Sequence, residues 1–202
     1  MMNPFSFFDS IYYISVKGRQ AARDRAAHQF SELGILDRVI FFDAILREPY
    51  WDGCRESHKE CIKIAKRQAA KNVLIFEEDV FFLHKDLGAL EKTLTELSRR
   101  DWDIFTLGCT IEKVFENTHP NLSVVSGYLN HAYAVNSHFF DTILNFKGSE
   151  KYYDGGKKIW SLSRLDLFLT KNNFKKHLMK PLMAVQPDKA AKTITSYYNK
   201  VL

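Results

Sequence analysis

The chain has 202 residues, of which 46% are hydrophobic and 26% charged, with 9 Gly and 5 Pro. This composition excludes collagen-like, low-complexity and largely disordered proteins. The length predicts a single domain, residues 1–202, with a sizeable buried core. Aromatic residues make up 14% of the chain, which indicates a thick core, a stacking surface or both.

Apolar runs alternate with amphipathic stretches, which is typical of an α/β domain with a mostly parallel central sheet flanked by helices. Ser57 and Glu60 have the spacing of a capping box, so a helix is expected to begin there. In the first half of the chain we predict strands at 11–16, 39–44 and 73–76, helices at 19–33 and 57–71, and a loop at 49–53.

The second half continues the alternation, with Asn136 or Ser137 as the expected cap of a short helix. Its glycine-bearing stretch 147–158 is expected to form a mobile loop. We predict helices at 87–99, 136–144 and 162–172, strands at 103–108, 131–135 and 181–185, a further loop at 110–121, and a polar tail.

The net charge of +5 is concentrated at the end of the chain, where residues 171–202 hold seven lysines against Asp188 alone. This basic segment is either a solvated face or a surface that attracts phosphate groups of a substrate, an anionic membrane or a nucleic acid. A nucleic-acid binder is the weaker reading, because no recognised binding motif accompanies the lysines. We therefore expect no nucleic-acid partner.

The cysteines Cys54, Cys61 and Cys109 form neither an even set nor a C-x-x-C pair. This argues against a disulfide framework and favours a reducing compartment. The first residues lack the basic leader of a signal peptide, and the apolar stretch 73–83 is too short to span a bilayer. We expect a cytoplasmic protein, with peripheral contact to an anionic membrane surface left open.

Three consecutive acids, Glu77, Glu78 and Asp79, interrupt the apolar run 73–83. Carboxylates beside a core either reach solvent at a strand end, become neutral or bind a cation. In an extended chain Glu77 and Asp79 point to one face and Glu78 to the other, so the first and third can share one ion. Oxygen ligands of this kind suit Mg²⁺ or Mn²⁺.

Several short motifs occur in a fixed order around this acidic triplet. The set consists of ISV with Arg19, Gly53-Cys54 with Ser57-His58, the run from Leu74 to Val80, Trp102-Asp103 with Leu107-Gly108, His131-Ala132-Tyr133, and Asp166 with Leu169. In order and spacing this set resembles glycosyltransferase family 25, which includes bacterial lipooligosaccharide and collagen galactosyltransferases. The resemblance extends over about residues 11–187.

The chain departs from that family's pattern at three places. Ser15 replaces an asparagine, Glu78 replaces the middle aspartate, and Leu46-Arg47 replace an acidic-glycine pair after the second strand. These changes bear on how the donor base and sugar are held. They also keep a second hypothesis open, a non-catalytic relative that binds a nucleotide sugar or a carbohydrate.

The resemblance implies a GT-A-like, Rossmann-like fold and an inverting hexosyltransferase. The donor would be a UDP-sugar, with galactose or glucose most expected, and the acceptor a hydroxyl of a glycan or lipid-linked glycan such as lipooligosaccharide. Glu77 and Asp79 would bridge Mn²⁺ or Mg²⁺ to the donor diphosphate. The charge that develops on the departing diphosphate is one that a metal can stabilise.

Four further residues are candidates for donor binding, each with a structural alternative. Arg19 either holds phosphate or is a solvated first turn. Ser57 is either a ligand or a helix cap. His58 either faces the site or orients the acidic strand, and His131 either contacts a substrate or is a buried structural histidine.

Inverting transfer needs a general base for the acceptor hydroxyl. Asp166 is the first candidate, although an acid early in a helix is also favoured by the helix dipole. Asp154, in the predicted loop, is the second. That loop could close over the donor and exclude water.

Overall fold

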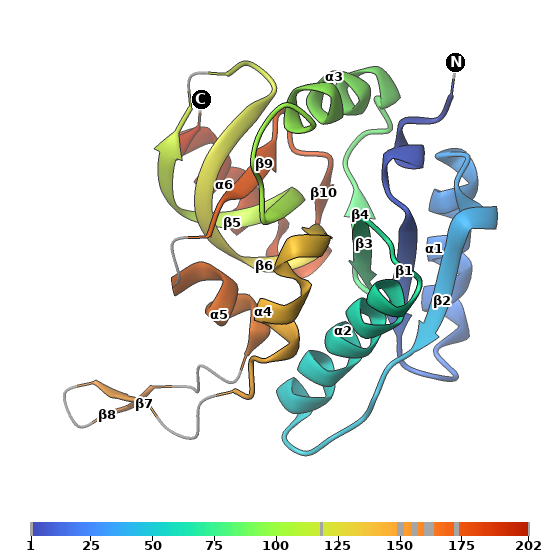
Figure 1. Ribbon diagram of the computed structural model, residues 1–202, viewed down its shortest axis with the longest axis vertical. Coiled ribbons are helices and arrows are strands. Elements are labelled where there is room, and N and C mark those ends of the chain that lie inside the picture. Colours follow the sequence, from blue (N-terminus) through green and yellow to red (C-terminus); the bar gives the residue numbers. More distant parts are fainter. Residues whose placement is uncertain are drawn as a thin grey trace.

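The structure, a computed structural model, describes residues 2–117, 119–148, 152–154, 157–159, 164–171 and 174–201. Its centre is a six-stranded sheet with the order β2-β1-β3-β6-β5-β9 (Figure 1). The strands are β1 (Ser10–Ser15), β2 (Val39–Asp43), β3 (Asn72–Glu77), β4 (Phe81–Phe82), β5 (Ile104–Glu116), β6 (Leu122–Asn136), β7 (Tyr152–Asp154), β8 (Lys157–Ile159), β9 (Lys176–Met179) and β10 (Ala184–Val185). The helices are α1 (Gln20–Glu32), α2 (Tyr50–Arg67), α3 (Leu87–Leu97), α4 (Phe140–Leu144), α5 (Leu165–Lys171) and α6 (Ala190–Lys200).

The domain is α/β, as the alternating pattern predicts, but its sheet is mixed rather than simply parallel. β1 pairs in parallel with β2 and β3, and β9 pairs in parallel with β5. β6 is antiparallel to β3, β5 and β9. The mixed character arises because β5 and β6 form a long hairpin whose second strand enters the sheet between β3 and β5.

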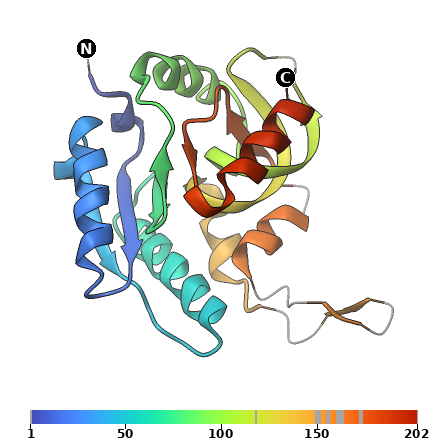
Figure 2. The same cartoon turned by 180° about the vertical axis from the view of Figure 1, so that it is seen from behind.

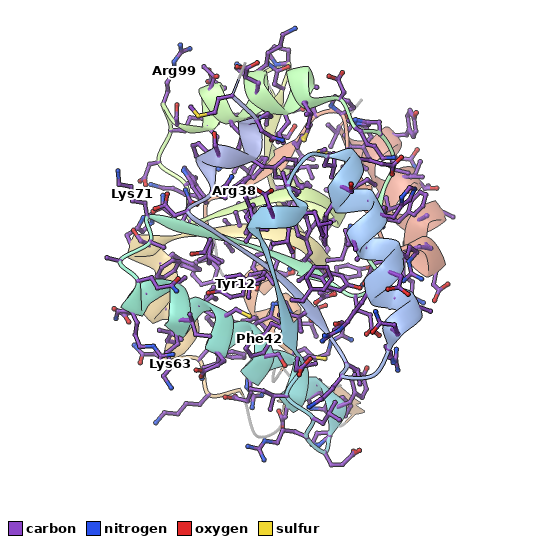
Figure 3. All side chains as sticks on the ribbon, turned by 90° about the vertical axis from the view of Figure 1, so that its right-hand side faces the viewer. Tyr12, Arg38, Phe42, Lys63, Lys71 and Arg99 are labelled. Carbon is purple, nitrogen blue, oxygen red and sulfur yellow. The ribbon has the colours of Figure 1, made fainter. Side chains whose placement is uncertain are left out.

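Alternate side chains of the central strands enter two separate cores. Ile11 and Tyr13 of β1 join the core under α1 and α3, whereas Tyr12 and Ile14 join the core under α2, α4 and α5. This is the period of two that a strand covered on both faces requires. Figure 3 shows Tyr12 in the interior, while Lys63 extends outward from α2.

The chain changes direction across the sheet at β1. From β1 it passes through α1 to β2 on one side, then through α2 to β3 on the other. In open α/β sheets ligands bind in the crevice at such a switch point, outside the carboxyl ends of the strands. Ser15 and Glu77 are the last residues of the two strands that border it.

The β5–β6 hairpin forms a curved wall at the other side of the sheet. His177 and Leu178 of β9 pair with both β5 and β6, so these three strands close on one another. Helix α6 covers this wall, and Tyr197 and Val201 bury their side chains against it (Figure 2). The sequence pattern predicts a polar tail here, but every third or fourth residue of α6 faces the wall.

Several element boundaries differ from the predicted ones. Helix α2 begins at Tyr50, within the predicted loop 49–53 and seven residues before Ser57. The predicted loop 110–121 is occupied largely by β5, and the predicted loop 147–158 contains β7 and the start of β8, which form a hairpin. For α2 and β5, long-range packing or pairing supplies stability that local propensity does not show, whereas β7 and β8 pair within a local hairpin.

The lysines of the basic segment do not form one solvated face. Lys176 and Lys180 are buried, and Lys175 forms an ion pair with Asp101. The exposed lysines of the segment that the structure describes include Lys189 and Lys192, at α6. Among the described residues no helix is long and apolar enough to cross a membrane.

Candidate functional site

A cleft with two compartments lies at the carboxyl ends of the central strands. The switch-point compartment has a volume of about 640 Å³ and is bordered by the ends of β1, β2 and β3. This volume is within the ~300–1,000 Å³ usual for small-molecule sites. The α5 compartment, of about 170 Å³, is bordered by β6, α5 and the segment after β10. The two compartments share Tyr50, Cys54, His58 and Glu77.

The loop after β2 forms one wall of the switch-point compartment and is fastened to α2. Ser57 Oγ accepts a hydrogen bond from the Ile45 N–H and donates one to the Gly53 carbonyl, both at 2.8 Å. A Cβ on Gly53 would lie 2.4 Å from the Ile45 oxygen and 2.9 Å from the Arg47 nitrogen, so this close approach requires glycine. Ser57 is therefore not a helix cap. Its hydroxyl is committed to the backbone and shapes the wall.

Glu77 and Asp79 converge at the point where the two compartments meet. The Gln186 Nε2 atom lies 2.9 Å from Asp79 Oδ2 and 3.4 Å from Glu77 Oε2. Gln186 reaches this position because β10 pairs with β4, with Val185 opposite Phe81. One amide group thus bridges the two carboxylates that the sequence predicts to share a ligand.

The surroundings of Asp79 favour its neutral form. Partial desolvation, followed by the negative charge of Glu77, raises the pKa of Asp79 to about 6. The residue remains exposed at the cleft mouth although protein atoms crowd its carboxylate. A carboxyl group with a raised pKa beside another acid is a common feature of functional sites.

Glu78 turns away from this pair, in a turn that follows the end of β3 at Glu77. Its carboxylate accepts a hydrogen bond from the Val16 N–H at 3.0 Å and forms an ion pair with Arg19. The backbone carbonyl of Glu78 also accepts a hydrogen bond from the Tyr13 hydroxyl. Arg19 lines the switch-point compartment with a side chain that is 63% exposed, so its guanidinium links Glu78 to the open space.

His58 connects Glu77 to the buried core. Its Nε2 atom lies 3.1 Å from Glu77 Oε1, and its Nδ1 atom lies 2.9 Å from the Tyr133 hydroxyl. Burial raises the pKa of the Tyr133 phenol. Because a carboxylate at Glu77 can only accept, Nε2 of the imidazole donates to it, and Nδ1 can then accept from the Tyr133 hydroxyl. His58 therefore both lines the cleft and holds Glu77 at the end of the acidic strand, the two roles that the sequence left open.

Asp166 lies in the α5 compartment, at the start of α5. Its two oxygens accept hydrogen bonds from Arg164, at 3.1 Å from Nε and 2.7 Å from Nη2. Helix α5 is fastened to β6 by Thr170, whose hydroxyl donates to the Gly127 carbonyl. Asp166 is thus held on a fixed support, facing the same cavity as Glu77.

The other two predicted site residues are not placed in the cleft. His131 is fully buried inside the sheet, where its ring lies beside Gly108. Its neighbour Asn130 lines the α5 compartment instead. The backbone of Asp154 ends β7, but its side chain is outside the described part of the structure.

The acidic strand end offers two carboxylates to a divalent cation. Among the described residues no group of three or more His, Cys, Asp or Glu side chains converges on one point. Two carboxylates do converge, and Mg²⁺ is commonly held by one or two carboxylates together with substrate phosphates and water. The mutual repulsion that raises the pKa of Asp79 also agrees with a place for positive charge. Glu77 and Asp79 therefore fit such an ion when a phosphate-bearing ligand completes its coordination.

Several residues of the site are not among the predicted ones, including Gln186, Arg164 and Asn130 as well as Tyr50 and Trp51. Gln186 follows the predicted strand 181–185 directly, so its place at a strand end was an available signal. Arg164 precedes Asp166 by two residues within the predicted helix 162–172. Asn130 shares β6 with Tyr133, and only the long hairpin brings it to the cleft.

Comparison with known proteins identifies no family to which this chain belongs. No protein-family profile matches it, and no curated protein matches it. Among solved structures it is similar to the crystal structure of A197 from STIV, with 11% sequence identity and a TM-score of 0.48. The match covers 87% of this chain and 83% of that one. At this level of similarity we draw no argument about function from it.

Proposed function

We propose that the protein is a metal-dependent hexosyltransferase. It would move galactose or glucose from a UDP-sugar to a hydroxyl of a glycan or lipid-linked glycan. The observation that carries the proposal is the convergence of the Glu77 and Asp79 oxygens on one atom at the switch point of the sheet. A cleft of about 640 Å³ opens directly beside them.

The arrangement of the strands supports a GT-A-like form of the fold. Pairing makes β2, β1, β3, β5 and β9 run in one direction, while β6 runs in the opposite one. The cleft lies at the carboxyl ends of the parallel set, where open α/β sheets place their ligands. The motif resemblance to glycosyltransferase family 25 points to the same fold and to the same acidic strand end.

In the proposed reaction Glu77 and Asp79 would hold Mn²⁺ or Mg²⁺, and Arg19 would face the donor phosphates. The cation, when bound, stabilises negative charge on the departing diphosphate. His58 and Tyr133 keep Glu77 in one orientation, as supporting hydrogen bonds do for metal-binding carboxylates. Glu78 contributes by fixing the β1–α1 turn.

Asp166 would act as the general base. The acceptor oxygen forms a bond to the anomeric carbon, the bond from that carbon to the diphosphate oxygen breaks, and the hydroxyl proton passes to Asp166. Attack from the face opposite the leaving group inverts the configuration. Arg164 holds both Asp166 oxygens, so the carboxylate is oriented before the acceptor arrives.

A second candidate is a non-catalytic module that binds a nucleotide sugar or a carbohydrate. The bridging amide of Gln186 favours it, because that group partly satisfies both carboxylates without a cation. The two candidates differ in one measurable property. A transferase of the proposed kind binds UDP much more tightly with Mn²⁺ than without it, whereas a carbohydrate module does not require the ion.

Calorimetric titration of UDP with and without Mn²⁺ tests the proposal. We expect wild-type binding to depend on Mn²⁺ and Asp79→Asn to weaken it by about 100-fold or more, because one of two protein carboxylates is lost. Glu78→Gln is the matched comparison in the same triplet. It should lose less than about 10-fold, since the Glu78 carboxylate faces Val16 and Arg19. Equal UDP affinity and equal metal dependence in wild type and Asp79→Asn would refute the metal site.

A further inference from the structure

The α5 compartment contains a buried polar group whose hydrogen bonding is incomplete. Asn130 is 4% exposed, and its Oδ1 atom accepts a hydrogen bond from Lys176 Nζ. Its Nδ2 atom is buried and has no hydrogen-bond partner among the described residues. Buried amide groups without a partner are rare in native structures, so each one requires an explanation.

Lys176 fixes the direction in which this amide points. The lysine is 1% exposed, and its Nζ atom also donates to the Gly127 carbonyl at 2.6 Å. The two acceptors that Nζ contacts are the Gly127 carbonyl and the Asn130 oxygen, so the NH₂ group of Asn130 is left without a partner among the described residues. Burial lowers the pKa of Lys176, and its amine can donate both hydrogen bonds in either protonation state. Asn130 lines the cavity, so this buried donor belongs to a residue of the cavity wall.

The cavity has room for more than a single ordered water. Its volume of about 170 Å³ compares with roughly 30 Å³ for one water in the liquid. Tyr50 and Trp51 border it with aromatic rings, and Leu165 and Leu169 add apolar surface. Apolar and aromatic walls with a few converging polar groups are typical of sites for small organic ligands.

The charges around the cavity select the class of ligand. Arg164 already holds Asp166, and Arg55 already pairs with Asp52 and Glu56. An anionic ligand would therefore meet the carboxylates of Glu77 and Asp166 without an uncommitted cation among these lining residues. A cationic ligand could not accept from Asn130 Nδ2. A neutral hydroxyl group both accepts and donates, so it suits the amide and a carboxylate together.

We propose that the α5 compartment binds a neutral sugar ring and that Asn130 Nδ2 donates to one of its hydroxyl oxygens. The aromatic rings of Tyr50 and Trp51 face the apolar side of the ring, and Asp166 accepts from a second hydroxyl. Lys176 is the positioning residue, because it acts through the Asn130 oxygen. Identifying this sugar as the glycosyl acceptor rests on the proposed transferase function, whereas the binding of the sugar does not.

The test uses the whole chain and two probes, methyl β-D-galactopyranoside and methyl β-D-glucopyranoside, titrated into ¹⁵N-labelled protein to about 100 mM. The side-chain amide signals of Asn130 are identified by their loss in Asn130→Asp. This variant keeps an oxygen for Lys176 and removes the free donor. Asn121→Asp, in the turn before β6, makes the same chemical change away from the cleft and is the control.

We expect at least one glycoside to shift the Asn130 amide signals, and Asn130→Asp to weaken its binding by about 10-fold or more. The control should bind as wild type does, and both variants should remain folded. Failure of wild type to bind either glycoside overturns the proposal, as does equal binding by Asn130→Asp. Mn²⁺-dependent UDP titration of the same samples reports on the proposed function separately. If the protein binds UDP but no glycoside, the proposed sugar site is refuted and the transferase function is not. If it binds a glycoside but no UDP, the transferase function is refuted and the sugar site is not.

Discussion

The two compartments of the cleft are built in different ways. The switch-point compartment follows from three successive β-strands, and its walls are backbone segments that begin where each strand ends. The α5 compartment is assembled from side chains of α2, β6 and α5, the end of β3 and the residue after β10. The first depends on three strand ends and on α2, which fastens the loop after β2, whereas the second also requires a hairpin, a short helix and a strand pair to meet correctly. We expect the two to respond differently to substitution.

The largest effect should come from Asp166→Asn in the α5 compartment. Loss of the general base should lower turnover by about 100-fold or more, while UDP affinity stays within about threefold. UDP release from UDP-galactose or UDP-glucose, with methyl glycosides as acceptors, measures turnover. Asp141→Asn, on α4 and paired with Lys66, is the control outside the cleft. Near-normal turnover would remove Asp166 from the mechanism.

Gly53→Ala should damage the switch-point compartment through the backbone. The added Cβ would collide with the Ile45 carbonyl, so we expect a loss of about 1–3 kcal/mol in the free energy of unfolding. Gly88→Ala in α3 is the control, because its Cβ meets only ordinary contacts and alanine favours helix. Urea unfolding of both variants gives the comparison. A stable Gly53→Ala protein would show that the loop after β2 can move without cost.

Tyr133→Phe should have a smaller effect. The substitution lies in the α5 compartment, but it should weaken UDP binding in the switch-point compartment. It removes the hydroxyl that orients His58 and, through it, Glu77. We expect Mn²⁺-dependent UDP binding to weaken by about 10-fold, as for other supporting hydrogen bonds around metal ligands. Tyr197→Phe, a buried tyrosine of α6, should leave it unchanged. Unchanged UDP affinity in Tyr133→Phe would mean that the Tyr133–His58 pair serves packing only.

The smallest expected effect concerns pH and the metal-free fold. Because the pKa of Asp79 is raised to about 6, the folded state binds its proton more tightly than the unfolded state. Stability therefore falls as pH rises from about 4 to about 6. Asp79→Asn should be more stable than wild type at pH 7, by less than about 1 kcal/mol because solvent screens an exposed charge. Thermal melts without metal at pH 4 and pH 7 test whether the difference disappears at the lower pH.

The same contrast explains what the sequence could predict. The strands at 11–16, 39–44 and 73–76 follow from local periodicity, and the structure agrees with them. Glu78 does face away from Glu77 and Asp79, but it does so in a turn after β3 rather than by strand alternation. The sequence predicts the start of α2 at Ser57, because Ser57 and Glu60 have the spacing of a capping box. In the structure the helix begins at Tyr50. Gln186 and Asn130 could not be placed, because each meets its partners across a large sequence separation. Lys176, for example, lies 46 residues from Asn130.

The pairing of β4 with β10 also has a consequence for synthesis on the ribosome. Gln186 follows Glu77 by 109 residues. At a translation rate of about 5–20 residues per second, the acidic pair is made about 5–20 s before its amide partner. During that interval β1, β2 and β3 are already available to pair and His58 can already contact Glu77, while the amide that bridges Glu77 and Asp79 does not yet exist. The bridge between the two carboxylates is therefore completed only after the strands that support it have been made.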